Sequence, residues 1–138
     1  MGIRTRVALA ATSAVTCGAI VLGVGFGGPG PASAQEKLAA RQVTVRFFTS
    51  LDRGRWSQAC SLLAKQFYRR NHVPDRRHCI AGFKIGMGGW AVKYRIGHVN
   101  GSRNAIVVHA VVDGAPGTVR LIRERHGYRV LAMQGDAA

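Results

Sequence analysis

The sequence predicts an α+β fold in which helices come first and an antiparallel sheet follows. Between positions 36 and 67, apolar residues recur at spacings of three and four, which is typical of amphipathic helices. From position 90 to 133 the pattern changes to alternation and short apolar runs separated by turn residues, which indicates strands. A run of helices followed by a run of strands favours α+β over a parallel α/β sheet.

The first predicted helix covers residues 36–51. Its apolar stripe runs from Ala40 to Leu51 at spacings of three and four, while Arg41 and Arg46 lie off the stripe. One face of this helix is therefore expected to pack on the core.

Two more helical segments are expected after a break at Asp52-Arg53-Gly54, where Asp52 is a turn residue or an N-cap. The second helix runs from Trp56 to Phe67 on the same periodicity. Residues 69–78 lack apolar periodicity and are expected to form a loop. A short helix then spans about Asp75 to Lys84, opened by a proline and ended by the glycines at 86, 88 and 89.

Four strands complete the prediction. The first alternates in polarity, and the second is apolar apart from His109, which places it in the middle of the sheet. The predicted strands cover residues 90–99, 105–112, 119–125 and 128–133, with turns at Asn100-Gly101, Asp113–Gly117 and His126-Gly127.

Residues 1–34 have the three parts of a secretory signal peptide. Arg4 and Arg6 precede an uncharged run over residues 7–26, and Ala32-Ser33-Ala34 has the small residues of a cleavage site. Cleavage is predicted between Ala34 and Gln35, which leaves a single domain of residues 35–138 outside the cytoplasm. The alternative is a membrane anchor formed by uncleaved residues 7–26.

The charge of the chain restricts its partners. It has 20 Lys and Arg against 6 Asp and Glu, a formal charge of +14. Removal of residues 1–34 takes only two arginines, so 18 cationic side chains remain against the same 6 acids, a charge of +12. Such a protein is attracted to acidic partners. Because it is exported, we expect anionic envelope lipids or polymers as partners rather than nucleic acid.

The cysteines predict one disulfide bond. Cys17 leaves with the signal peptide, and Cys60 and Cys79 remain. An even count in a short exported chain favours a bridge, and closing a loop of about 20 residues is worth roughly 3 kcal/mol. A catalytic thiol is the alternative, which no other feature of the sequence supports.

The search for catalytic and metal-binding residues gives weak candidates. His98 and His109 on adjacent strands could act as acid and base in a small secreted ribonuclease, although the predicted turn does not place them directly opposite. Glu124 is the acid that could point inward, and the alternative is a surface ion pair with the neighbouring Arg123 or Arg125. His72 and His78 flank Asp75 without a tetrahedral ligand set. No metal or cofactor is therefore predicted.

The most pointed local feature is a basic loop. Arg69, Arg70, Arg76 and Arg77 lie within nine residues, inside the segment that the predicted disulfide closes. Arginine forks match phosphate and carboxylate groups, so this loop is a candidate anion-binding site. The alternative is an ordinary solvated loop.

Several short segments occur along the predicted order of helices and strands: Phe47-Phe48, Asp52 with Ala59–Leu63, Cys79-Ile80-Ala81 and the closing Gly-Tyr-Arg-Val at 127–130. In these segments the chain resembles small secreted bacterial proteins of the nuclear transport factor 2-like superfamily. The resemblance implies a cone, in which a curved antiparallel sheet wraps around the helices, with an apolar pocket at the open end. It also implies a homodimer as the usual form. The candidate pocket residues are Phe83, Trp90 and Tyr94.

Members of that superfamily include ketosteroid isomerase-like and polyketide cyclase-like enzymes as well as proteins that only bind or assemble, so the resemblance fixes shape more than function. The sequence predicts an exported, non-catalytic binding or assembly module with a basic, anion-attracting surface and room for a small apolar ligand. The alternative is a small secreted enzyme, either isomerase- or cyclase-like or a ribonuclease.

Overall fold

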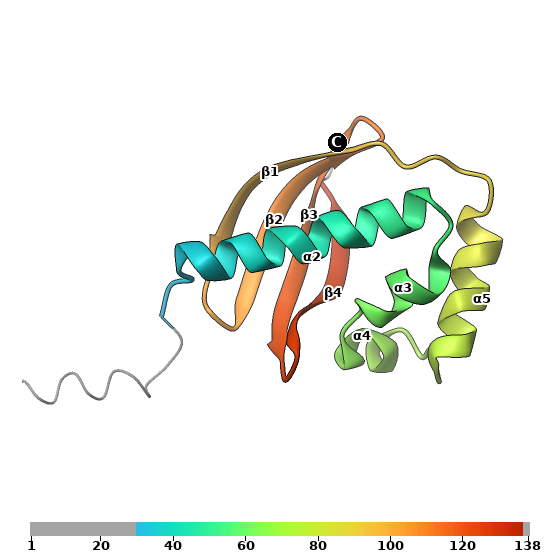
Figure 1. The fold of residues 1–138 in the computed structure, drawn as a ribbon, viewed down its shortest axis with the longest axis horizontal. Coiled ribbons are helices and arrows are strands. Elements are labelled where there is room, and N and C mark those ends of the chain that lie inside the picture. The colour runs from blue at the N-terminus through green and yellow to red at the C-terminus, as the bar shows by residue number, and fades with distance from the viewer. Residues whose placement is uncertain (1–29, 137–138) are drawn as a thin grey trace, which may run out of the picture. The chain divides into compact units, whose positions relative to one another are not determined.

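A computed structural model describes residues 30–136 and confirms the α+β order (Figure 1). The predicted signal segment up to residue 29, with the alternative anchor at 7–26, lies outside the described residues. Four helices precede four strands: α2 (Ala34–Asp52), α3 (Trp56–Ser61), α4 (Lys65–Arg70), α5 (Arg76–Met87), β1 (Tyr94–Gly101), β2 (Ala105–Val112), β3 (Ala115–Glu124) and β4 (Gly127–Gly135).

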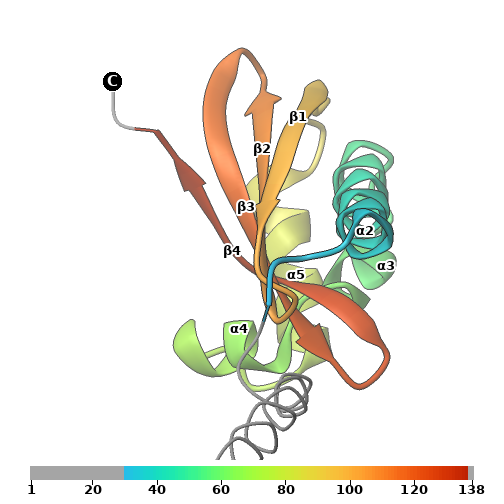
Figure 2. The ribbon, with the colours of Figure 1, turned by 90° about the vertical axis from the view of Figure 1, so that its left-hand side faces the viewer.

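The strands form an antiparallel meander in the order β1-β2-β3-β4. One face of this sheet packs against α2, where Phe47 of the helix and Ile106, Leu121 and Val130 of the strands are fully buried. Each such side chain contributes roughly 1.5–3 kcal/mol through the hydrophobic effect. Figure 2 shows α2 lying along this side of the sheet. Among the residues that the structure describes, no helix has the length and apolar character needed to cross a bilayer.

Helix α2 begins two residues before its predicted start because Ser33 caps it. The Ser33 hydroxyl accepts a hydrogen bond from the Glu36 amide, and the Glu36 carboxylate accepts one from the Ser33 amide, which together form a capping box. Just before the cap, Pro31 forms a β-bridge with Ser102 and Ala32 is buried. The predicted cleavage bond after Ala34 therefore lies in the first turn of a folded helix.

The second predicted helix is wrong as a single element, because residues 62–64 interrupt it. The Ala64 amide donates to the Val130 carbonyl and the Val130 amide donates to the Leu62 carbonyl, both at 2.8 Å. These three residues thus extend the edge of the sheet alongside β4 and separate α3 from α4. Leu62, Leu63 and Ala64 are all buried. Because the apolar pattern of the sequence continues through these residues, it does not show that the helix is interrupted there.

The predicted roles of Asp52 and of residues 90–93 also change. Asp52 is the last residue of α2, and its carboxylate accepts a hydrogen bond from the Val92 amide at 2.8 Å. The N-cap position of α3 is Arg55, which makes no capping bond. Strand β1 starts at Tyr94 rather than Trp90, because the amides of Val92 and Lys93 bind the carboxylates of Asp52 and Asp113 instead of a neighbouring strand.

All three hairpin turns differ from their predicted positions, and the third lies at Arg125-His126 instead of His126-Gly127. Asn100 and Gly101 belong to β1, and the hairpin turn follows at Arg103-Asn104. The next hairpin has a two-residue turn at Asp113-Gly114, where both residues have positive φ (51° and 84°), as the tight turns of hairpins require. Strand β3 therefore starts at Ala115, four residues before its predicted start. The predicted loop over 69–78 shrinks in the same way, because α4 and α5 extend into it.

Candidate functional site

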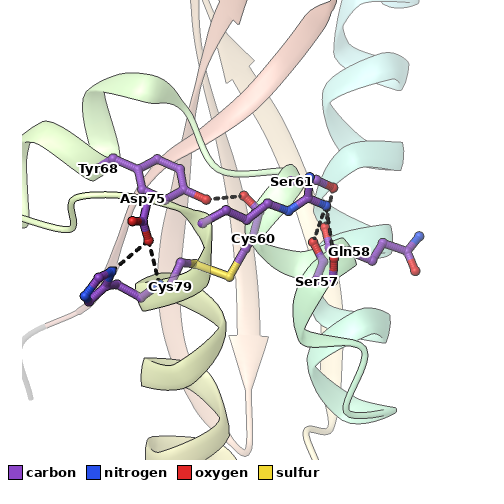
Figure 3. The surroundings of a disulfide bond; sticks show 9 residues. Ser57, Gln58, Cys60, Ser61, Tyr68, Asp75 and Cys79 are labelled. Carbon is purple, nitrogen blue, oxygen red and sulfur yellow. Dashed lines mark hydrogen bonds and ion pairs between the residues drawn. A yellow bond between two sulfur atoms is a disulfide. The ribbon is translucent and has the colours of Figure 1, made fainter.

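The predicted disulfide between Cys60 and Cys79 is confirmed. It joins α3 to α5, with the two Cα atoms 6.1 Å apart and Cys60 only 1% exposed. Figure 3 shows the Tyr68 hydroxyl beside this bond, where it donates to the Cys60 carbonyl at 2.7 Å. Burial raises the pKa of the Tyr68 hydroxyl above its usual value. The bridge therefore holds α3, α4 and α5 as one unit.

Asp75 starts α5 as its N-cap. Its Oδ1 accepts hydrogen bonds from the His78 amide at 2.9 Å and from the His78 ring at 2.7 Å. The bond from the His78 side chain lowers the pKa of Asp75 most strongly. His72 precedes this cap with a positive φ of 55°. Within residues 30–136, no group of three or more His, Cys, Asp or Glu side chains is arranged to hold a metal ion.

The four predicted anion-binding arginines lie on two helix ends. Arg69 and Arg70 end α4, and Arg76 and Arg77 begin α5. Arg76 donates from Nη2 to the carbonyl and hydroxyl of Ser57, at 2.9 and 3.1 Å, and so ties α5 to α3 beside the disulfide. The other three side chains are exposed. Of the four arginines, Arg76 therefore has a structural role, whereas the other three can contact a ligand.

A basic hollow of about 500 Å³ lies between α4 and the β3–β4 hairpin, and we call it the α4 groove. It collects side chains from two parts of the chain that the sequence does not bring together. Its lining residues are Lys65, Gln66, Arg69, Ile122, Glu124, Arg125, His126 and Arg129.

The groove exists because α4 lies on the opposite side of the sheet from α2, as Figure 2 shows. Ile122 pairs with Arg129 across β3 and β4, next to the buried pair Leu121 and Val130. Since neighbouring residues of a strand point to opposite faces, Ile122 and Arg129 face away from α2. The sheet-edge segment at 62–64 leads the chain to this side, where α4 then packs beside β4.

The groove is electropositive. Lys65, Arg69, Arg125 and Arg129 face a single carboxylate, Glu124, and that carboxylate accepts a hydrogen bond from the Lys65 amide at 2.9 Å. Within residues 30–136, none of the four cations forms a salt bridge with Asp or Glu. Arg129 donates one guanidinium hydrogen bond to the Tyr128 carbonyl at 2.9 Å. Cations without an acidic partner are available to an anion.

A second hollow of about 580 Å³ adjoins the α4 groove and shares Lys65, Arg69, Glu124 and Arg129 with it. It leads toward the disulfide and adds Arg76 and the carboxylate of Asp75 to the lining. The two hollows together form a longer basic surface than a single phosphate needs, which suits a ligand with several anionic groups.

His98 and His109 are brought together more closely than the sequence indicates. The pairing of β1 with β2 is irregular between Ile96 and Val99, so both Gly97 and His98 lie opposite His109. The two imidazole rings stack with their centroids 3.9 Å apart. Rings at this distance are in van der Waals contact, and a phosphate does not fit between them. Neither ring lines the α4 groove or the apolar cavity.

The three predicted pocket residues lie in different surroundings. Phe83 packs against Phe47 and Trp56, and the Tyr94 hydroxyl is hydrogen-bonded to Thr49 at 2.8 Å. Trp90 is 69% exposed. None of the three lines the apolar cavity of about 250 Å³, which lies near the β2–β3 hairpin. The lining residues of that cavity are Phe48, Ala110, Val112, Ala115, Pro116, Gly117, Thr118, Val119, Met133, Gln134 and Gly135.

All six carboxylate side chains of the chain lie within the described residues, and none is buried. Glu124 is half-buried in the basic groove, and the apolar cavity has no titratable side chain in its lining. A carboxylate that abstracts a proton from a carbon acid needs a desolvated site. The structure offers no such group among the acids of this chain.

Sequence reasoning identified Arg69 as an anion-binding residue and Glu124 as a candidate acid, and it missed the other charged or titratable residues of the groove, namely Lys65, Arg125, His126 and Arg129. The alternation of β3 and β4 could have placed Arg129 on the outer face of the sheet. No sequence signal, however, shows that α4 crosses to that face, because the crossing depends on backbone pairing between residues 62–64 and β4.

No protein-family model matches the chain, and no curated protein matches it either. Among solved structures, a 2.5 Å structure from Catenulispora acidiphila is similar with a TM-score of 0.44 and 15% identity, over 72% of this chain and 88% of that chain. A similarity of this size carries no argument about family or function.

Proposed function

We propose that this chain is an exported, non-catalytic binding module that takes up a polymer or lipid headgroup bearing phosphate or carboxylate groups through the α4 groove. The observation that carries the proposal is the groove itself, where four cationic side chains surround one carboxylate that is already bonded to a backbone amide. Such a site lacks internal compensation for its charge, and an anionic ligand supplies it.

The groove is suited to extended anions rather than to one small ion. Lys65, Arg69 and Arg125 are exposed, so each can adjust to a repeating chain of charges. Binding of this kind is dominated by electrostatic attraction and weakens as salt screens it. The disulfide supports the site by limiting how far α4 moves relative to α3 and α5, which reduces the entropy lost on binding.

Two observations favour binding over catalysis. The candidate acid and base His98 and His109 stack in contact on the sheet, outside the groove. No buried carboxylate is present to act as an isomerase-like base. We also propose that the chain is a member of the nuclear transport factor 2-like superfamily with its cone-shaped fold. Residues 1–34 are proposed to act as its export signal.

The experiment measures binding of a soluble polyphosphate by calorimetry, at salt concentrations from about 0.05 to 0.3 M. It compares Arg69→Gln/Arg125→Gln, which removes two groove charges, with Arg70→Gln/Arg77→Gln, which removes two charges of the predicted loop. All four side chains are exposed, so both variants should fold. We expect the groove variant to lose about tenfold in affinity, equivalent to roughly 1.4 kcal/mol, and the loop variant to lose less than threefold.

Equal losses in the two variants would mean that binding follows net charge alone, and the groove would no longer be the site. A wild-type protein that does not bind polyphosphate at about 0.05 M salt would overturn the proposed function as a whole.

A further inference from the structure

The end of α5 presents two large apolar side chains to solvent. Ile85 is 86% exposed and Trp90 is 69% exposed, and they are five positions apart along the chain. Single exposed apolar residues are common on protein surfaces. Two of this size within six residues, at one end of a helix, are a reason to ask what they contact.

Trp90 is held in place rather than left on a loose loop. Its amide donates to the Met87 carbonyl at 3.1 Å, and two residues later the Val92 amide is bound by Asp52. The Lys93 amide is bound in turn by Asp113. These bonds fix the linker on both sides of an exposed indole, so its exposure is a property of the fold.

The outer surface of α5 beside these residues is almost bare of side chains. Gly82, Gly86 and Gly89 have open space where a Cβ atom would be, and Ala81 is exposed. Ile85 and Trp90 therefore stand out from their surroundings. Such a surface can approach the interface of a lipid bilayer closely, whereas it has few features for shape complementarity with a protein partner.

The charged side chains along the chain on either side of Ile85 and Trp90 are positive. No Asp or Glu occurs between Asp75 and Asp113, while this stretch contains six Lys and Arg side chains, among them Lys84 and Lys93. The neighbouring carboxylates of Asp52 and Asp113 are engaged by backbone amides. Apolar side chains flanked by cations are the pattern that binds the interface of anionic bilayers, where tryptophan is favoured.

We propose that the end of α5, with Ile85 and Trp90, docks on the surface of a bilayer that contains anionic lipid. The indole and the isoleucine side chain enter the headgroup region, and Lys84 and Lys93 contact the phosphates around them. This contact uses no residue of the α4 groove, so the protein has two separate attachment points for anionic material, one for the lipid surface and one for an extended anion.

The experiment uses the full chain with Trp56→Phe, which leaves Trp90 as the one tryptophan of the chain. Vesicles of phosphatidylglycerol and phosphatidylcholine should shift the Trp90 fluorescence to the blue, and vesicles of phosphatidylcholine alone should not. In a second measurement, Ile85→Ser/Trp90→Ser in the natural background should weaken co-sedimentation with the anionic vesicles about tenfold. The matched control Leu38→Ser removes another side chain that is about half exposed, on α2, and should change affinity less than twofold.

The proposal fails if Trp90 shows no blue shift, or if Leu38→Ser weakens vesicle binding as much as the α5 variant does. Polyphosphate binding separates this result from the proposed function. It should be unchanged in Ile85→Ser/Trp90→Ser, whereas Arg69→Gln/Arg125→Gln should lose polyphosphate and keep the blue shift of Trp90. A variant that loses both ligands together would refute the existence of two separate attachment points.

Discussion

The N-terminal end of α2 and the disulfide-linked segment from α3 to α5 treat their charges in opposite ways. At the start of α2, Glu36 completes the capping box and also forms salt bridges with Arg103 at 3.2 Å and Arg123 at 2.9 Å. In the α3–α5 segment, Asp75 holds the first turn of α5, and Glu124 of the adjacent strand β3 holds the first residue of α4. Among the residues that the structure describes, the arginines of this segment form no salt bridge with a carboxylate.

The difference shows where the basic surface comes from. Most acids of the chain are used to fix backbone amides, at Val92, Lys93, Lys65 and His78. Within residues 30–136, only Glu36 also forms salt bridges with arginines. The chain has few carboxylates, and most of them bind backbone amides instead of cationic side chains. The positive surface follows from this, because most cations have no carboxylate beside them.

The largest effect is expected from removing the disulfide that links α3 to α5. Cys60→Ser/Cys79→Ser should lower the free energy of unfolding by about 3 kcal/mol, because the bridge closes a loop of about 20 residues. Urea denaturation of wild type and variant measures the loss. Adding a reductant should lower wild-type stability to that of the variant and leave the variant unchanged. A loss below about 1 kcal/mol would show that the bridge does little to hold the segment.

A smaller effect breaks the other side, at the start of α2. Ser33→Ala removes the side-chain acceptor of the capping box and should cost about 1 kcal/mol. Ser33→Thr keeps a hydroxyl and should recover most of that loss. Both values come from the same urea titrations, and a cost that Thr does not recover would mean that the capping bond is not what stabilises this end.

The smallest effect sharpens the comparison through pH. Hydrogen bonds from Ser33 to Glu36 and from His78 to Asp75 lower the pKa of each carboxylate. Folding therefore favours the charged form, so the stabilisation is fully present above about pH 5 and is lost as pH falls below about 4, toward the lowered pKa values.

Thermal unfolding between about pH 6 and 3 tests this effect at the two ends separately. Glu36→Gln should reduce the acid-side loss of stability that arises at α2, and Asp75→Asn the loss that arises at α5. A stability that rises on acidification in this range would contradict the sign of both shifts.

The features that the sequence predicted well are those that depend on local pattern. The apolar stripe of α2 and the overall order of helices and strands follow from periodicity, and the Cys60–Cys79 bridge from cysteine count. The missed features depend on contacts between distant residues. The break at 62–64 exists only because its backbone pairs with Val130, and the α4 groove depends on that break.

The stacked histidines teach the same lesson on a smaller scale. An irregularity in the pairing of β1 with β2 and a turn three residues later than predicted bring His98 onto His109. Neither feature has a signal in the residues themselves. The sequence pattern placed His98 and His109 on adjacent strands, but it could not predict that their rings are in contact.

The capped start of α2 has a consequence for the predicted cleavage after Ala34. The bond between Ala34 and Gln35 lies in a helical turn, and Pro31 and Ala32, just before it, are held on the β1–β2 hairpin by a β-bridge and a hydrogen bond to Gly101. Proteases cut segments that open locally. A peptidase that cuts this bond must therefore act before residues 31–36 fold. A chain that folds first keeps residues 31–34 as part of its structure.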